Sequence, residues 1–223
     1  RGELAFYVGC LNLAGCLRGL GMRVCIPNLL PSESKDRSWQ GLYDVSLALT
    51  KNEAVVGNDL DAAGKRLYVI TGANQGGKST FLRSIGQAQL MAQSGMFVGA
   101  DSFSAPIRHG VFSHFKREED SAMKSGKLDE ELVRMSGLAD HLGGGALMLF
   151  NESFAATNER EGSEICRQIT KAILTPSHSL AMGRRNSCER SGWAAASALL
   201  RSYRANPCRL PSERICTEKY LDE

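Results

Sequence analysis

The fold is decided by one stretch of sequence, Leu67-Tyr68-Val69-Ile70-Thr71-Gly72-Ala73-Asn74-Gln75-Gly76-Gly77-Lys78-Ser79. Its first five residues are mostly apolar or β-branched, which favours a strand. The glycine-rich part favours a turn, and residues 80–92 carry apolar side chains at helical spacing. A strand, a glycine turn and a helix in this order form the first half of a βαβ unit. The stretch therefore predicts an α/β domain.

Residues 72–79 of this stretch match the pattern GxxxxGKS. Between a strand and a helix, this pattern is typical of a P-loop, which cradles the phosphates of ATP. The glycines let backbone N–H groups approach phosphate oxygens, and the helix directs its positive end at the same anion. We expect Lys78 to reach the β- and γ-phosphates and Ser79 to place its hydroxyl on Mg²⁺. The alternative is an ordinary glycine turn before a helix.

A second candidate element follows the apolar run at residues 146–150, which predicts a strand. P-loop ATPases usually place Asp and then Glu at the end of such a strand, and here the pair is Asn151-Glu152. Glu152 can polarise a water molecule as a general base. Asn151 is neutral and offers Mg²⁺ only its amide oxygen, so we expect weaker metal binding. The alternative is a plain turn at the end of a strand.

The remaining sequence alternates between helical spacing and short apolar runs. Residues 1–30 have helical spacing that ends near Gly19 or Gly21. Further helices are expected at about 128–142 and 159–174. Apolar runs that predict further strands lie at residues 42–49, 54–56, 96–98 and 111–112.

Composition sets limits on the functional class. The chain has 223 residues, a net charge of +3 and no run of about 18 apolar residues, so we expect no membrane span. It begins without Met or a signal-peptide pattern, which indicates a cytoplasmic fragment of a longer protein. Its seven cysteines and four histidines are scattered, without the spacing of a zinc site or a catalytic triad. The cysteines are therefore expected to be reduced thiols.

Two segments resemble the ATPase module of the MutS mismatch-repair family. Residues 70–83 resemble its phosphate loop, which has an Asn and a double Gly, and residues 92–98 resemble the AQxGxFV segment after its first helix. The resemblance covers residues 40–174 and implies a P-loop NTPase fold of the ABC ATPase type. It also implies that Asn58 lines the adenine pocket. The ATP-binding residues implied in this half of the chain are Asn58, Gly72, Ala73, Asn74, Gln75, Gly76, Gly77, Lys78, Ser79 and Thr80.

Residues 125–132 lie where this family has its ABC signature, which reaches the γ-phosphate bound to a dimer partner. The resemblance implies that Ser125 and Gly126 contact ATP in a homodimer, although the other signature residues depart from the family's form. The alternative is a charged helix face. Thr157-Asn158 matches the family's D-loop. The run Asn151-Glu152-Ser153-Phe154 resembles a standalone bacterial MutS-like subgroup, and contact with DNA is implied through domains mostly outside this chain.

The last part of the sequence departs from the family. The resemblance places a strand and a switch histidine after the helix that follows Glu152, but His178 lies next to Pro176 and Ser177 and is a poor candidate. A deletion and frameshift near residue 175 is a hypothesis that the nucleotide sequence would test. If it is correct, we expect the sheet to lack a strand. The expected domains are residues 1–35, the end of a helical arm; 36–175, the ATPase domain; and 176–223, an aberrant or poorly ordered tail.

Two functional alternatives stay open at this point. Asn151 and the missing histidine favour a nucleotide-binding protein with little or no turnover. A P-loop kinase or transferase would instead phosphorylate an acceptor, and the segment at residues 92–98 argues against it. The leading expectation is an ATP-hydrolysing module that dimerises with ATP between its subunits.

Overall fold

The computed structural model describes residues 2–70, 76–116, 126–142, 145–154, 157–174, 197–201 and 215–216. The chain divides into two compact units, and each is described by itself. The first unit contains residues 1–65 and 74–107, and the second contains residues 66–73 and 108–223. The predicted domain limits at residues 35 and 175 stay predictions.

The first unit is built on a four-stranded sheet in the order β1-β5-β2-β3. β1 and β5 are parallel, whereas β2 is antiparallel to both of its neighbours. Along β2 the buried Trp39 alternates with more exposed residues, and its ring stacks on Phe103 of β5 at 5.9 Å between centroids. The strands are β1 (Asn28–Leu30), β2 (Ser38–Leu42), β3 (Asn58–Asp61) and β5 (Ser102–Pro106).

Three helices complete the first unit, and a second apolar cluster joins them. Leu17 of α1 is fully buried with Tyr43, Val45 and Ala48, and Met91 of α3 packs against the same cluster. α1 ends at Gly19, as the helical spacing of residues 1–30 predicted. The helices are α1 (Gly2–Gly19), α2 (Val45–Lys51) and α3 (Lys78–Gln93).

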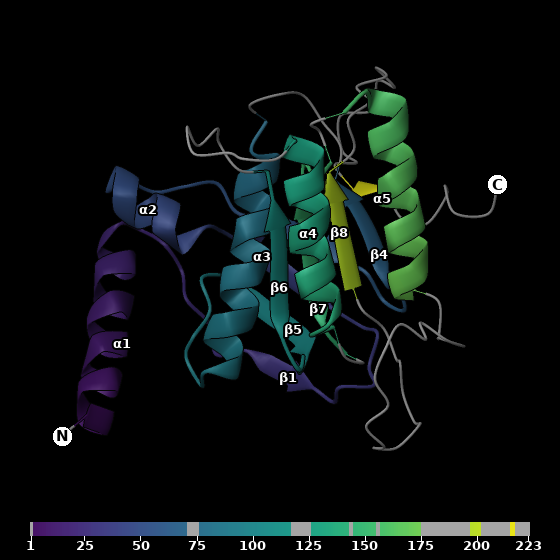
Figure 1. Cartoon of the computed structure of the whole chain (residues 1–223). Helices are drawn as coiled ribbons and strands as arrows, with labels where there is room; N and C mark the ends of the chain where they lie inside the picture. The colour runs from purple at the N-terminus through teal and green to yellow at the C-terminus, as the bar shows by residue number, and fades with distance from the viewer. Residues whose placement is uncertain are drawn as a thin grey trace. The chain divides into compact units, whose positions relative to one another are not determined.

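The second unit contains a five-stranded sheet in the order β6-β7-β8-β4-β9. Its first four strands are parallel, and β9 pairs with β4 in the antiparallel direction. The strands are β4 (Leu67–Ile70), β6 (Val111–Phe115), β7 (Leu147–Asn151), β8 (Ser197–Arg201) and β9 (Ile215–Cys216). Figure 1 draws β8 beside β4 and near β7, with α4 (Lys127–Ala139) and α5 (Glu159–Leu174) along the sheet.

One face of this sheet packs against α4 and α5. Met148 and Phe150 of β7 and Leu67 of β4 form a buried cluster with Met135 of α4 and Leu174 of α5. The other residues of β7, Leu147 and Leu149, are buried on the opposite face of the sheet, so the first four residues of the strand are all buried. A strand buried on both faces explains why the run at residues 146–150 is continuously apolar.

Several expected elements differ from the structure. Residues 45–51 form α2 instead of a strand because Asp44 provides an N-cap, and its carboxylate accepts the Leu47 N–H at 3.0 Å. Residues 54–56 and 96–98 form no strand, and Val98 makes only an isolated bridge with Cys25. The expectation of a sheet that lacks a strand after α5 is wrong, because β8 lies between β7 and β4.

The described part of the chain contains no helix with the length and apolar content needed to cross a membrane. His178 lies outside the residues that the structure describes. The frameshift hypothesis concerns residues after 175, of which the structure describes only β8 and β9.

Candidate functional site

The described part of the predicted phosphate loop is the start of α3. Gly77 is the N-cap of this helix with φ of 79°, a left-handed conformation that favours glycine. The carbonyl of Gly77 accepts the Phe81 N–H at 2.8 Å, which closes the first helical turn. Lys78, the first helical residue, is buried, while Ser79 and Thr80 are half-buried. Gly76 is exposed, and the predicted contacts Gly72, Ala73, Asn74 and Gln75 lie outside the described residues.

The start of α3 is held in the first unit by a contact between aromatic rings. Phe81, in the first turn of α3, makes an edge contact with the Trp39 ring at 6.4 Å between centroids. Trp39 itself is stacked on Phe103, so two strands of the sheet hold the side chain that Phe81 meets. The orientation of the helix N-terminus is therefore set by aromatic packing on the sheet.

A polar anchor one turn further along α3 fixes the helix against α2. Asp44 is fully buried, and its carboxylate accepts hydrogen bonds from Arg83 Nε at 2.5 Å and Gln87 Nε2 at 3.0 Å. Gln87 Oε1 in turn accepts the Val45 N–H at 3.0 Å. The carboxylate that caps α2 thus also holds α3 through hydrogen bonds, and both of its oxygens take part.

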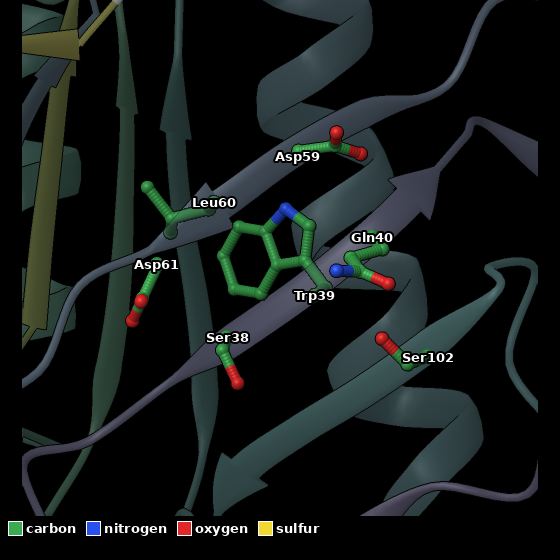
Figure 2. Close-up of a pocket in the computed structure, with 7 residues that line it drawn as sticks. All are labelled: Ser38, Trp39, Gln40, Asp59, Leu60, Asp61 and Ser102. Carbon is green, nitrogen blue, oxygen red and sulfur yellow. The ribbon is translucent and has the colours of Figure 1, made fainter.

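Asn58, expected to line an adenine pocket, is the half-buried first residue of β3 and pairs with Leu42 of β2. Near it, strands β2, β3 and β5 line a pocket of 420 Å³ in the first unit (Figure 2). Asp59 and Asp61 line this pocket, and Asp59 accepts the Gly41 N–H at 2.6 Å. None of the predicted site residues lines this pocket, so it does not carry the expected phosphate chemistry.

The second predicted element, Asn151-Glu152, lies at the carboxyl end of β7. Asn151 is the last residue of the strand, and both side chains are half-buried. Glu152 has φ of 51° and Phe154 has φ of 60°, although neither is glycine. Left-handed backbone is costly for side chains of this size, and such strain persists only where the surrounding structure enforces it.

Ser153, between these two strained residues, is held by a buried histidine. The Ser153 hydroxyl donates to the His114 carbonyl at 2.8 Å, so towards the ring it can only accept. The Nδ1 of His114 lies 2.7 Å from this hydroxyl oxygen and therefore carries the ring proton. Arg134 of α4 donates to Nε2 at 3.0 Å, which requires a lone pair on that nitrogen. These two contacts favour the neutral Nδ1–H tautomer of His114. One contact favours the other tautomer, because the Glu131 carbonyl lies 3.2 Å from Nε2 and would accept a proton carried there.

The surroundings of His114 keep it neutral. Its ring is 1% exposed and stacks on Phe154 at 5.2 Å between centroids. Burial lowers the pKa of His114, and the charge of Arg134 lowers it further, while the nearby carbonyl of Glu131 acts in the opposite direction. A neutral ring at this position is therefore favoured around neutral pH.

Glu131 of α4 makes a second link to the same turn. Its side chain is buried, and its carboxylate accepts the backbone N–H of Phe154. Its Oε2 atom has no hydrogen-bond partner within the described residues. Burial raises the pKa of Glu131, an effect that the Phe154 hydrogen bond and the charges of Arg134 and Lys116 only partly offset.

The predicted signature and D-loop positions lie at two helix starts in the second unit. Gly126 is the exposed N-cap residue of α4, and Ser125 lies outside the described residues. Asn158 Oδ1 accepts the Glu161 N–H at 3.0 Å, and Thr157 donates to the Glu161 carboxylate at 2.5 Å. Asn158 therefore caps α5, and the Glu161 carboxylate holds the preceding residue, Thr157, through its hydroxyl.

The structure places the predicted residues in both units. Lys78, Ser79 and Asn58 belong to the first, whereas Gly126, Asn151 and Glu152 belong to the second. Sequence reasoning missed His114, although a titratable residue inside the apolar run Val111-Phe112-Ser113-His114-Phe115 is a detectable signal. It also missed Arg134 and Glu131, since the helical segment 127–139 reads simply as a charged helix.

Comparison with known proteins places this chain in one family. Residues 68–183 match the family model described as MutS domain V. Endonuclease MutS2 of Geobacillus kaustophilus is 34% identical over 127 residues, which are 56% of this chain and 16% of that protein. DNA mismatch repair protein MutS of Chloroflexus aurantiacus is 31% identical over 136 residues, 60% of this chain and 14% of that protein.

A human relative extends the comparison to eukaryotes. MutS protein homolog 4 of Homo sapiens is 27% identical over 136 residues, 61% of this chain and 14% of that protein. The matched segment is thus a small part of each of these relatives. The family match covers half of the chain and includes both the loop at Lys78 and the turn at Glu152. The chain therefore belongs to the MutS family.

Proposed function

We propose that this chain is the ATP-binding and ATP-hydrolysing module of a MutS-type protein that acts on DNA. The observation that carries the proposal is the start of α3, where the GxxxxGKS pattern meets a helix that begins at Lys78 behind a left-handed Gly77. A helix N-terminus with a lysine and a hydroxyl in its first turn binds phosphate through its N–H groups and its positive end. The membership of the MutS family also supports the proposal.

In this proposal the module has a P-loop fold of the ABC ATPase type and binds ATP with Mg²⁺. Lys78 neutralises phosphate charge, and Ser79 and Asn151 offer oxygen donors of the kind that Mg²⁺ prefers. Both donors are neutral, so the negative charge that holds the ion comes from the nucleotide. When bound, Mg²⁺ supplies charge neutralisation on the phosphates. Glu152 orients and polarises the attacking water as a general base.

ATP-dependent homodimerisation belongs to the same proposal. Gly126 caps α4 without a side chain that accepts its first N–H groups, so this helix start has donors for an anion. The γ-phosphate of ATP bound to a second copy is assigned to this position by the family resemblance, while Asp129 and Glu130 in the first turn of α4 oppose an anion there. Contact with DNA is proposed for the whole protein, through segments outside this chain. The endonuclease named in the MutS2 relative is not carried over, because the match covers 16% of that protein.

The test is a titration of the chain with ATP and Mg²⁺ that follows nucleotide binding and phosphate release. Lys78→Ala is expected to weaken ATP binding by about 10- to 100-fold, the range for a hydrogen bond to a charged group. Lys51→Ala removes an exposed lysine that pairs with Glu53 and is the matched control, with binding unchanged. Equal binding by the parent chain and Lys78→Ala would contradict the proposal.

Hydrolysis is tested with the Glu152→Gln variant. Its phosphate release is expected to fall by about 100-fold or more while ATP binding persists, because general-base catalysis contributes about 10²–10⁴-fold. The control is Glu164→Gln, on the exposed surface of α5. Dimer formation by Glu152→Gln with ATP, followed by light scattering, tests the homodimer. A phosphorylated acceptor in place of free phosphate would indicate a kinase or transferase instead.

Asn151 favours one second candidate, a protein that binds ATP without turning it over. A neutral residue at the end of β7 weakens the hold on Mg²⁺ relative to a carboxylate. Asn151→Asp separates the two functions. If the parent chain binds ATP without releasing phosphate and Asn151→Asp gains turnover, the chain is a nucleotide-holding module and not an ATPase.

A further inference from the structure

We propose that His114 is a positioning residue, which transmits the position of α4 to the turn that carries Glu152. Arg134 of α4 contacts one ring nitrogen of His114, and Ser153 contacts the other. Ser153 directly follows Glu152 in the chain. The proposal rests on the proposed hydrolysis, because it concerns the geometry of the general base in that reaction.

The backbone at Glu152 needs such a support. Its φ of 51° is unfavourable for a residue with a side chain, and the same holds for Phe154 two residues later. Between them, Ser153 is fixed by an exchange of two hydrogen bonds with His114, one through the ring and one through the carbonyl. These bonds are buried, so water does not replace them when they break. Loss of either bond removes part of what holds Glu152 in its strained conformation.

The link to α4 passes through the choice of ring tautomer. The other tautomer would place a proton on Nε2, between the guanidinium of Arg134 at 3.0 Å and the Glu131 carbonyl at 3.2 Å. The first contact disfavours this tautomer and the second favours it, so Arg134 decides the balance. Arg134 also donates to the carbonyl of Phe115 at 2.9 Å, so its own position is fixed by β6. While Arg134 stays in place, His114 presents an N–H to Ser153. If α4 moves and withdraws Arg134, the ring can adopt the other tautomer, and the donor to Ser153 is lost.

A second contact runs in parallel from the same helix. Glu131, one turn before Arg134, accepts the backbone N–H of Phe154. The strained turn is thus tied to α4 at two residues, at Ser153 through the side-chain relay and at Phe154 directly. Because α4 starts at Gly126, the proposed contact with a partner's ATP, the general base is positioned only when α4 is positioned.

The experiment measures kcat, KM and ATP affinity for the parent chain and for Ser153→Ala, Arg134→Met and His114→Leu. We expect kcat to fall about 10- to 100-fold while ATP affinity stays within about 2-fold, because a misplacement of about 1 Å can cost about 100-fold in rate. His114→Asn places an amide N–H near the Nδ1 position and is expected to retain kcat within about 5-fold of the parent. Arg167→Met, which removes an exposed arginine of α5, is the matched control with unchanged kcat.

A spectroscopic measurement adds a readout that mere loss of stability does not change. Nitrogen-15 NMR of the parent chain near neutral pH is expected to show the Nδ1–H tautomer of His114. Arg134→Met is expected to show a mixture of both tautomers. If His114→Leu does not fold, the two other variants carry the test.

The outcomes separate this proposal from the proposed function. Without phosphate release that depends on Glu152 in the parent chain, the proposed hydrolysis fails, and this inference fails with it. If the parent chain turns over ATP but Ser153→Ala and Arg134→Met keep its kcat, only this inference is overturned. An equal fall in ATP affinity and kcat would also overturn it, because a general loss of structure and not the position of Glu152 would then explain the effect.

Discussion

Asp44 in the first unit and Glu131 in the second are both buried carboxylates that tie a helix to a neighbouring segment, but their oxygens are used differently. Asp44 accepts hydrogen bonds on both oxygens, from Leu47, Gln87 and Arg83. Glu131 accepts the N–H of Phe154 and leaves Oε2 without a partner within the described residues. Asp44 is therefore a stabilising anchor, whereas Glu131 maintains its contact at a cost to stability.

The difference shows where the fold tolerates strain. The helix that starts at Lys78 rests on the fully paired carboxylate of Asp44 and on the ring of Trp39. The turn that carries Glu152 combines two left-handed residues with an incompletely paired carboxylate. Strain of this kind concentrates at functional sites, which agrees with the proposed role of Glu152.

The largest expected effect comes from removing the Asp44 carboxylate. Asp44→Ala removes the cap of α2 and leaves Gln87 and Arg83 without their acceptor, so the free energy of unfolding should fall by about 3 kcal/mol. Urea unfolding followed by circular dichroism measures it. Glu53→Ala, at an exposed ion pair beside α2, is the control and should change stability by less than about 0.5 kcal/mol. A similar loss in both variants would show that Asp44 is no special anchor.

A smaller effect is expected from crowding the strained turn. A Cβ atom at Gly162 of α5 would lie 2.4 Å from the Phe154 carbonyl oxygen, so Gly162→Ala should lower the free energy of unfolding by about 2 kcal/mol. At Gly137 of α4 a Cβ meets nothing within 4 Å. Gly137→Ala should therefore raise stability by about 0.5–1 kcal/mol through helix propensity. Thermal unfolding of both variants checks the pair, and effects of the same sign would contradict it.

The coupling between Asp44 and Arg83 sharpens the first prediction. Asp44→Asn, Arg83→Met and the double variant form a cycle that isolates the charged hydrogen bond at 2.5 Å. We expect a coupling free energy of about 1.5 kcal/mol, because Asp44 is buried and Arg83 is half-exposed. A coupling free energy near zero would mean that the cap of α2 alone explains the loss in Asp44→Ala.

The smallest expected effect is a gain of stability at Glu131. Burial raises its pKa above 4.5, so the folded chain holds this proton more tightly than the unfolded chain. The contribution of Glu131 to stability is therefore present at acidic pH and is lost as pH rises from about 4.5 through the raised pKa. Glu131→Gln should remove this dependence and raise the free energy of unfolding at pH 7 by about 1 kcal/mol.

The measurement for Glu131 is urea unfolding of parent and variant between pH 4 and pH 8. Destabilisation at pH 7 in Glu131→Gln would show that the ionised carboxylate is favourable and that the contrast with Asp44 is wrong.

Elements with long periodic patterns could be predicted from the sequence. The strand before the phosphate loop, the strand before Glu152 and both helices of the second unit lie within a few residues of their expected positions. Each has either a continuous apolar run or a full amphipathic repeat. The α/β class follows from their alternation, and the family membership follows from the motifs.

The other strands and the His114 contacts could not be predicted, because they depend on contacts between residues that are far apart in the sequence. β2 and β5 are short, and each has a single aromatic residue among mostly polar or small ones. They are joined by antiparallel pairing and by the stacking of Trp39 on Phe103, which a local sequence pattern does not reveal. The strand β8 belongs to an apolar run, Ala194-Ala195-Ala196-Ser197-Ala198-Leu199-Leu200, which alone is equally consistent with a helix. The His114 relay was missed because its members come from three segments that are far apart in the sequence.

The position of β8 has a consequence for how the protein is made. β4 ends at Ile70 and leaves the ribosome before the other strands of its sheet, but the strand that lies between it and β7 begins at Ser197. At a translation rate of about 5–20 residues per second, β4 waits about 6–25 s for this neighbour. During that time the edge of β4 is open to pairing with other chains, and that of β7 is open for the shorter interval after Asn151 has been made. Nascent chains that stall between these two strands are therefore expected to depend on chaperones, whereas the sheet of the first unit is complete once residue 106 has emerged.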